Sequence, residues 1–503
     1  MEVPDNTPDG NSSNNSESNI NNGENNPTEN NDNIINDLDG NHLMNGEFNN
    51  SYASSNSDSN DFEDIQELPQ SLTRTYPRQQ QDADSETEIV EIDTKPLRRI
   101  SRFMTFINLT NSLLGAGIIS MSSSFKAAGL GPTVLLLIIS CILCYISGVV
   151  LLNLQCELHI SNIDELANGI FGRPCHIITA ILIFIFDLAF TTAYLVIGTD
   201  SILSWLRCSP EKYRIKFNGF GAWAIIITIY SMAVIALTIP RNLIFLNKFQ
   251  MLTVFLIVFY AIAILARGFA VENLPAPSVV GTKFSMSLFT SFSAQCLTFC
   301  LPIHMLPVIS PYNPNQLKRQ TIMASSLFFC FIVIATPGAM GYLIFGNDAK
   351  SDLLRSFPDN DVLMIIVRVA IFLIVTFSYP VIIKEMVGTL GGFIYHNNNP
   401  AEMTLKQRCI LIPIVNLISY VFALLSNTIL PILGIGGALG TFIVTFAFPS
   451  ICRLKITHSK LSHPRNIGHI IFACFGIAMA VICLYTSIND LVDAYKQQSI
   501  YHH

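Results

Sequence analysis

Asn108-Leu-Thr-Asn-Ser-Leu-Leu-Gly-Ala-Gly-Ile-Ile-Ser120 lies in the first strongly apolar segment after a long polar N-terminal region. Its composition differs from that of an ordinary membrane helix, because Asn, Thr and Ser side chains are followed at once by Gly115-Ala116-Gly117. Gly is about 1 kcal/mol worse than Ala in a helix. In lipid, a broken helix is tolerated only where the freed backbone is buried in protein or lines a wet cavity. The stretch therefore predicts a membrane helix that breaks at these glycines.

A break at this place would create an anion-binding site. A half-helix that begins near Ile118 would point free N–H groups, with about half a positive charge, toward the break. Many secondary transporters hold a substrate carboxylate in this way. The alternative is that Gly115 and Gly117 only let two helices pack closely, since small residues are common at membrane helix interfaces. The neighbouring Asn and Thr favour the broken helix.

The distribution of charge divides the chain into two parts. Only 13% of the 503 residues are charged, which is about half the fraction in soluble domains. Residues 1–94 hold 21 acidic and two basic side chains, whereas the remainder has a net charge of +12. The first 60 residues include 19 Asn and few large apolar side chains, so they cannot offset the entropy of ordering. The sequence predicts a disordered, acidic cytosolic tail (1–94) and a transmembrane domain (95–503).

Eleven apolar runs are long enough to span a hydrocarbon core of about 30 Å. They cover residues 103–125, 131–156, 175–206, 220–239, 246–266, 284–308, 321–345, 362–383, 407–426, 428–451 and 467–489. With a cytosolic N-terminus, 16 Lys and Arg lie near the cytosolic helix ends and 10 on the other side, which agrees with the positive-inside rule. The predicted fold class is an all-α, multi-pass membrane protein.

Several polar side chains lie at membrane depth. Asp187 is near the middle of the third run, where an ionised carboxylate costs at least about 2.5–3.5 kcal/mol and suggests an ion pathway. Desolvation favours its protonated form, which makes it a candidate proton carrier, and the alternative is a protonated Asp bonded to a neighbouring helix. His304 and Gln295 lie on the sixth run, and either can satisfy a neighbour's backbone. Thr376 and Ser378 lie midway along the eighth run, where most hydroxyls bond back to their own helix.

The opening stretch, continuing to Phe125-Lys-Ala-Ala-Gly129, resembles the first-helix signature of the amino acid/auxin permease family. It is most similar to the sodium-coupled neutral amino acid transporters and the fungal vacuolar amino acid transporters. Further stretches agree in the family's order, namely Leu237-Thr-Ile-Pro-Arg-Asn-Leu243, Phe292-Ser293 with Cys296 and Leu301-Pro302-Ile303, and Val367–Pro380. The resemblance covers about residues 98–490 and leaves out the tail.

This resemblance implies a LeuT-type 5+5 inverted repeat with 11 transmembrane helices, of which the first and the sixth are broken. Substrate would lie between the two broken helices. The residues implied or selected for substrate binding are Asn108, Asn111, Leu114, Gly115, Ala116, Gly117, Ile118, Ser293 and Gln295. Asn111 with Thr376 or Ser378 matches positions of the family's sodium site, and Asp187 is added for ion coupling from its position alone.

The chain also departs from the family's pattern. Ser122-Ser123-Ser124 stands where many relatives have Pro or Ser and then Tyr. In the sixth helix, Leu297 stands at a His position and His304 at a Tyr position, and a Glu that usually follows is missing. These departures leave the substrate and the coupling ion open.

The sequence therefore predicts a secondary active transporter of amino acids, coupled to protons and located in a fungal vacuolar membrane, with the plasma membrane as the alternative. The Asn-rich acidic tail looks fungal, and protons are the usual driving force at such a membrane. The alternatives are sodium coupling at Asn111 and Thr376, and a transporter-like amino acid sensor. An enzyme is not expected, because no HExxH, GxSxG or GxxxxGK[ST] motif occurs. The expected partners are an amino acid, the coupling ion and the lipid bilayer, with no cofactor and no nucleic acid.

Overall fold

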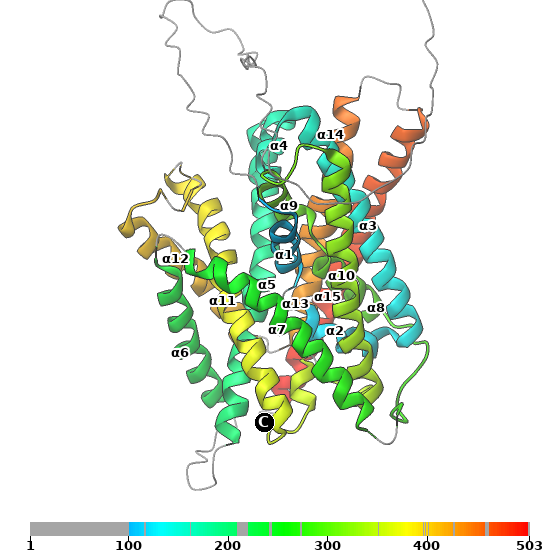
Figure 1. Ribbon diagram of the computed structural model, residues 1–503, viewed down its shortest axis with the longest axis vertical. Helices are drawn as coiled ribbons and strands as arrows, with labels where there is room; N and C mark the ends of the chain where they lie inside the picture. Colours follow the sequence, from blue (N-terminus) through cyan, green and yellow to red (C-terminus); the bar gives the residue numbers. More distant parts are fainter. Residues whose placement is uncertain are drawn as a thin grey trace, which may run out of the picture. The chain divides into compact units, whose positions relative to one another are not determined.

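The structure is a computed structural model (Figure 1), and it describes residues 100–500 apart from 115–116, 161, 209–219, 241–243, 272–273, 351, 396, 398, 401, 426–427 and 458–461. All regular elements in this part of the chain are helices. The all-α fold class is therefore confirmed for the described residues. The tail 1–94 and the predicted site residues Gly115 and Ala116 lie outside them.

The helices follow the order of the predicted apolar runs. They are α1 (Arg102–Leu113), α2 (Gly117–Ala128), α3 (Leu130–Leu158), α4 (Ile163–Phe171), α5 (Arg173–Arg207), α6 (Phe220–Thr238), α7 (Ile244–Phe269), α8 (Ser287–Thr298), α9 (Pro302–Ile309), α10 (Gln316–Phe345), η2 (Gly346–Asp348), η3 (Leu353–Ser356), α11 (Val362–Tyr395), α12 (Leu405–Leu425), α13 (Ile429–Gly436), the π-helical η4 (Gly437–Ala447), α14 (Phe448–Ile456) and α15 (Pro464–Ile500).

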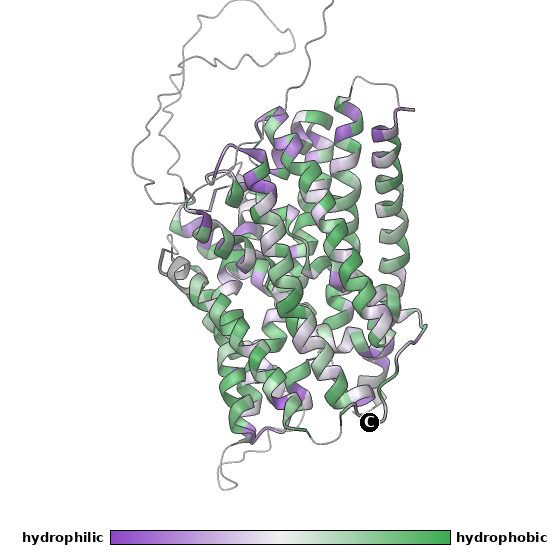
Figure 2. Cartoon of the chain, turned by 45° about the vertical axis from the view of Figure 1, so that its right-hand side comes forward, coloured by the Kyte–Doolittle hydropathy of each residue, from purple (hydrophilic) through white to green (hydrophobic). Residues whose placement is uncertain are grey.

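Ten helices in the described residues are long and apolar enough to cross a membrane, when α8–α9 and α13–η4–α14 are each taken as one. The bent pair α1–α2 makes an eleventh if it counts as one span. Hydrophobic residues line the middle of the helices, and hydrophilic residues gather at their ends (Figure 2). The short helix α4 lies outside the predicted runs and is amphipathic, because Ile163 and Leu166 are buried while Asp164 and Glu165 occupy its first turn.

The spans differ in how much of their surface other helices cover. Most of α5, α8–α9 and α13–η4–α14 is buried, whereas α6 and α15 are mostly exposed. Their exposed side chains are large and apolar, for example Ile229 on α6, which is 65% exposed, and Val481 on α15, which is 66% exposed. Such faces suit lipid tails, which need no hydrogen-bonding partner. The buried spans are therefore the ones that can form a site.

The first span is interrupted at the place that the glycines indicate. α1 and α2 are bent by 51° relative to each other, and Leu114 leaves the helix with extended backbone angles. The start of α2 also lies close to α8, since a Cβ at Gly117 would be 2.0 Å from Thr298 Oγ1. Only Gly allows this approach. For Gly117 both explanations apply, because the helix pair bends beside it and it permits close packing with α8.

A second interruption lies directly beside the first. α8 ends at Thr298 and α9 begins at Pro302. α8 is fixed to α13, because Ser293 Oγ donates a hydrogen bond of 2.7 Å to the carbonyl oxygen of Gly434. A Cβ at Gly437 would be 2.2 Å from the carbonyl oxygen of Ser293, so glycine is required at this contact too. The two interruptions face each other across the Gly117–Thr298 contact.

Candidate functional site

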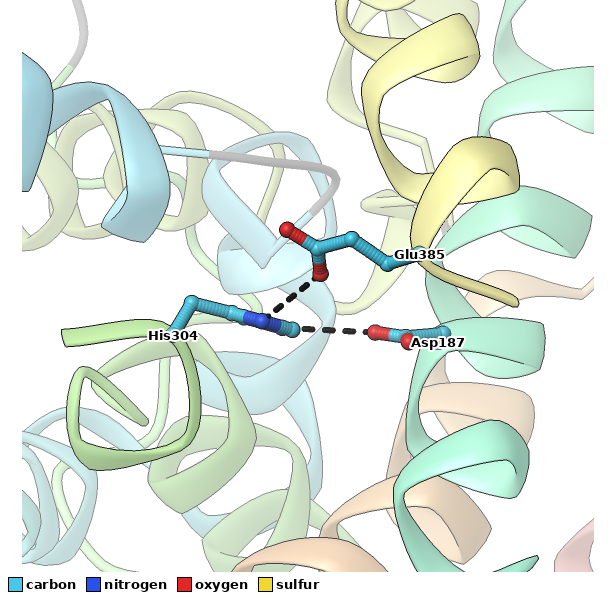
Figure 3. Close-up of side chains that lie close together, drawn as sticks. All are labelled: Asp187, His304 and Glu385. Atoms are coloured by element: carbon cyan, nitrogen blue, oxygen red, sulfur yellow. Dashed lines mark ion pairs between the residues drawn. The ribbon is translucent and has the colours of Figure 1, made fainter. Parts of the chain in front are cut away.

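Three ionisable side chains from three helices meet inside the described helices (Figure 3). Asp187 comes from α5, His304 from α9 and Glu385 from α11. The imidazole Nε2 is 3.3 Å from Asp187 Oδ1, and its Nδ1 is 2.8 Å from Glu385 Oε2. Both ring nitrogens must carry a proton to donate to two carboxylates at once, so the geometry fits the charged imidazolium. We call these three residues the carboxylate–histidine cluster.

The exposure of the cluster rises from one member to the next. The side chain of Asp187 is 1% exposed, that of His304 20% and that of Glu385 46%. Water therefore reaches Glu385 directly, whereas almost none of the Asp187 side chain is exposed. The cluster forms a short chain of titratable groups from solvent to the protein interior.

Local sequence explains the placement of two members. His304 lies in the first turn of α9, which begins at Pro302, and Pro suits a first helical position because no N–H is needed there. Glu385 follows Pro380, which lies inside α11 and removes one backbone hydrogen bond from that helix. The ring of Phe186 lies 5.7 Å from the imidazole, measured between centroids, and limits the positions that the imidazole can take.

His304 and Glu385 stand between two hollows. The smaller one, the central cavity, has a volume of about 80 Å³ and is lined by Asn111, Ser112, Phe190, Tyr194, Thr253, His304, Phe377, Ser378, Val381, Ile382 and Glu385. The larger one, the vestibule, has a volume of about 730 Å³ and reaches the surface beside the exposed residues Glu165 and Asn168. His304 and Glu385 line both hollows, whereas Asp187 lines the vestibule alone.

The central cavity combines a few polar groups with apolar walls. Thr253 Oγ1 donates a hydrogen bond of 2.5 Å to Asn111 Oδ1. Tyr194 and Ser378 add two hydroxyl groups to the lining. Ser112, His304 and Glu385 are the other polar residues of the lining, and the apolar part consists of Phe190, Phe377, Val381 and Ile382. This combination is typical of small-molecule binding sites.

Other predicted site residues lie in different surroundings. Thr376 Oγ1 is 3.0 Å from the hydroxyl of Tyr230 on α6, and Thr376 does not line the central cavity. Gln295 is fully buried, and its Nε2 donates to Ser291 Oγ at 3.3 Å. Ser293 bonds to α13, as described above. Of the predicted coupling residues, Asn111 and Ser378 both line the central cavity.

The described residues at the break form a buried group beside the cavity. Leu114, Gly117 and Ile118 are buried, and Asn108 Oδ1 is buried with no hydrogen-bond partner among the described atoms. None of these four lines the central cavity. Their contribution to substrate binding stays a prediction.

Glu385 and Tyr194 are absent from the predicted site. The eighth apolar run ends at residue 383, so Lys384-Glu385 looks like the polar end of a span. In the structure α11 continues to Tyr395, which places Glu385 inside the helix. The position of His304 within an apolar run could have indicated its role, because ionisable side chains inside separate membrane spans are expected to pair with each other.

The cluster can hold a cation. It has a net charge of −1 when His304 is protonated and −2 when it is neutral, and buried negative charge without a partner is unfavourable. Each member offers one ligand atom, and these atoms lie within 4.8 Å of one another, a spacing that a metal ion can also use. Both ring nitrogens already face carboxylates, so a metal ion would have to replace an ion pair. A proton fits without rearrangement.

A family model described as transmembrane amino acid transporter protein matches residues 98–489. Among curated proteins, the chain is similar to the sodium-coupled neutral amino acid transporter 7 of Xenopus laevis, with 23% identity over 74% of this chain and 85% of the relative. The proteins of the same name from Danio rerio and Homo sapiens are 22% and 21% identical, each over 74% of this chain and 83% of the relative.

These matches confirm the resemblance found in the sequence. The family model covers most of the chain, including both interruptions and all three members of the cluster. The spans and the paired hollows agree with a protein that moves a small molecule across a bilayer. The chain belongs to the amino acid/auxin permease family of transmembrane amino acid transporter proteins, and it is a multi-pass membrane transporter of amino acids rather than an enzyme.

Proposed function

We propose that the chain is a proton-coupled secondary transporter in which the carboxylate–histidine cluster carries the coupling proton. The main support is that His304 and Glu385 line both the central cavity and the vestibule. Substrate in the cavity and protons from the vestibule meet at the same two side chains. Glu385 exchanges protons with water, His304 passes them inward, and Asp187 is the buried end of the path.

Loss of the proton changes how three helices are held together. The imidazolium pairs with α5 and α11 at once, whereas a neutral imidazole has only one N–H to donate. Deprotonation therefore releases one carboxylate from α9. The charged and titratable groups that face the cluster from the vestibule are Asp164, Glu165, His176 and Lys384. In this proposal, the link between α9 and its neighbours opens and closes with the charge on the imidazole.

The substrate's carboxylate binds at the first interruption, beside residues 114–118. Support comes from the start of α2 at Gly117, because the N-terminus of a helix attracts anions. Asn111 and Ser112, in the last turn of α1, line the central cavity, so the interruption adjoins the hollow. Asn108, Ser293 and Gln295 are the further candidates for substrate binding.

Sodium coupling is the alternative, because the similar curated proteins are named sodium-coupled transporters. The two predicted ligands, Asn111 and Thr376, are hydrogen-bonded to Thr253 and Tyr230 respectively. A sodium site at these positions requires both to change partners. Ser378 shares the central cavity with Asn111 and is the better second ligand. These contacts favour the proton.

We further propose the architecture and location that the sequence implies. The two interrupted helices would be the first members of a LeuT-type 5+5 repeat, with α15 as the added eleventh span. The tail 1–94 would be cytosolic and separate from the transport domain 95–503, in a vacuolar membrane. A fluorescent fusion in a fungal cell tests the location. Uptake by a protein lacking residues 1–94 tests the sensor alternative, because a sensor binds amino acid without net flux.

The coupling proposal is tested with purified protein in proteoliposomes. Flux is measured across a panel of amino acids under imposed pH or sodium gradients. Asp187→Asn keeps the side chain's shape but removes its titration, so pH-driven accumulation should disappear while exchange of bound substrate survives. Glu402→Gln is the matched control, because Glu402 lines neither hollow. Wild-type pH dependence in Asp187→Asn would reject the role of Asp187.

Asn111→Ala separates the two ions. In a sodium-coupled carrier it removes a ligand and should abolish sodium-driven flux. In a proton-coupled carrier it removes a cavity residue and the acceptor of the Thr253 hydrogen bond, which contributes about 0.5–1.5 kcal/mol, so flux should weaken but remain driven by the pH gradient. Flux that requires sodium and is lost in Asn111→Ala favours the alternative.

A further inference from the structure

The central cavity is too small for a whole long amino acid. Its volume is about 80 Å³, which is space for roughly five to eight waters if each occupies about 10–15 Å³. That space suits the backbone end of an amino acid and the first atoms of its side chain. The cavity borders the vestibule at His304 and Glu385, so a long side chain has to extend past these residues.

The vestibule beyond this point is strongly acidic. Among the described residues that line it, four are acidic, namely Asp164, Glu165, Asp187 and Glu385, and one is a lysine, Lys384. These described groups together have a net charge of −3 with both histidines neutral and −2 with His304 protonated. Carboxylates that line a low-dielectric hollow concentrate cations there. A negatively charged side chain would be repelled along the whole path.

One oxygen of Asp164 also lacks a hydrogen-bonding partner among the described residues. Asp164 Oδ1 is buried and accepts no hydrogen bond from the described residues. Burial raises the pKa of Asp164, and the nearby His176 opposes this rise. A buried acceptor without a donor is unfavourable, and a ligand that brings N–H groups with a positive charge would satisfy it.

We propose that the transported amino acids carry a cationic side chain, an ammonium or a guanidinium. The proposal rests on the proposed transport function. The backbone end occupies the central cavity, the alkyl stem passes Ile183, Ile303 and Pro307 on the vestibule wall, and the cationic end reaches Glu385, Asp164 and Glu165. Charge-assisted hydrogen bonds to these carboxylates supply the selectivity over neutral side chains of the same length.

The test measures kcat/KM for lysine, arginine, glutamine, leucine and glutamate with the full chain in proteoliposomes. We expect lysine and arginine to exceed glutamine by about tenfold, as one charge-assisted contact allows. The double variant Asp164→Asn/Glu165→Gln should reduce that preference while the value for glutamine changes by less than about twofold. Glu402→Gln, on the loop after α11, is the control and should leave the preference intact. Glu165→Gln alone is the second variant, because Glu165 is exposed on α4 and its replacement does not threaten folding.

The outcomes separate this inference from the coupling proposal. Proton-coupled transport restricted to neutral amino acids would overturn the inference and keep the coupling. Transport of lysine without any response to a pH gradient would keep the inference and reject the coupling. An equal loss for lysine and glutamine in Glu165→Gln would also overturn it, because a charge that selects the substrate must act on the cation alone.

Discussion

The helix α5 carries two aspartates with different partners, Asp187 near its middle and Asp200 nearer its C-terminal end. Asp187 pairs with a histidine beside the vestibule, whereas Asp200 accepts a hydrogen bond of 2.6 Å from Arg355 Nε. The two aspartates are about 20 Å apart along the helix. Arginine stays charged at any pH that a protein experiences, while histidine changes charge near neutrality. The region around Asp200 and Arg355 is therefore held by fixed charges, and we call it the fixed end. The region around Asp187, His304 and Glu385 is held by ion pairs that a proton can switch, and we call it the switchable end.

The fixed end is built around the connection between α10 and α11. Arg368 Nη2 donates to the carbonyl oxygens of Leu354 and Phe357 at 2.9 and 3.1 Å, and Arg267 pairs with Asp361 at 2.6 Å. Arginines thus tie the described part of this connection to α5, α7 and α11. A transporter with one fixed and one switchable end has its pH response at the switchable end.

The first prediction makes the switchable end fixed. His304→Lys replaces the imidazole with an ammonium that stays protonated near neutral pH and holds both carboxylates. Transport should fall by about 100-fold, the size typical of a lost proton-transfer group, while substrate binding persists. Counterflow and equilibrium binding in proteoliposomes measure the two effects. His463→Lys makes the same substitution at an exposed histidine that lines neither hollow and should transport normally, and unchanged pH-dependent flux in His304→Lys would show that the cluster is not the switch.

The second prediction breaks the fixed end. Arg355→Met leaves Asp200, whose side chain is 10% exposed, without its cationic partner, and the partly exposed position of Arg355 limits the effect to about 1–3 kcal/mol of lost stability. The chain has two tryptophans, and both, Trp205 and Trp223, lie near this end, so thermal unfolding followed by their fluorescence reports it directly. Adding Asp200→Asn should restore part of the stability. If the double variant is no more stable than Arg355→Met, the pair is not what holds the connection.

The sequence predicts the spans well because lipid imposes a length and a composition on every one of them. It also singles out Asp187, a carboxylate in the middle of an apolar run, which lies beside His304 in the structure, and its role in coupling stays a prediction. Glu385 is missed because hydropathy places the end of the span two residues before it, although α11 continues. The partner of Asn111 is missed for another reason. Thr253 lies in an unremarkable apolar run, and sequence order does not tell which helices face each other.

The third prediction concerns α2, which links the interruption to the fixed end, because Lys126 Nζ donates to the carbonyl oxygen of Ala349 at 3.1 Å. Gly117→Ala places a Cβ against Thr298 and should destabilise the protein by about 1–3 kcal/mol. Thr298→Gly in the same chain makes room for it. If the double variant regains stability but not substrate affinity, Gly117 serves binding as well as packing. If it regains both, the contact with α8 explains the glycine.

The smallest expected effect tests whether the fixed end is fully insensitive to pH. Asp352 is 2% exposed, and its Oδ1 accepts the backbone N–H of Leu354 at 2.8 Å. Burial raises the pKa of Asp352 to about 7, the charge of Asp200 adds to the rise, and Arg355 and Arg368 oppose it. An unfolded Asp has a pKa of about 3.9. The folded protein therefore holds a proton between about pH 4 and pH 7 that the unfolded chain has released, and this stabilisation is lost as the pH rises through about 7.

The melting temperature of the wild type should fall between about pH 5 and pH 8. Asp352→Asn keeps an acceptor for Leu354 but cannot ionise, so it should melt about 2–4 °C above the wild type at the higher pH and close to it at the lower one. Asp348→Asn, on the same connection, is the control. Equal melting temperatures for Asp352→Asn and the wild type at both pH values would mean that arginine holds this end without any contribution from a titrating group.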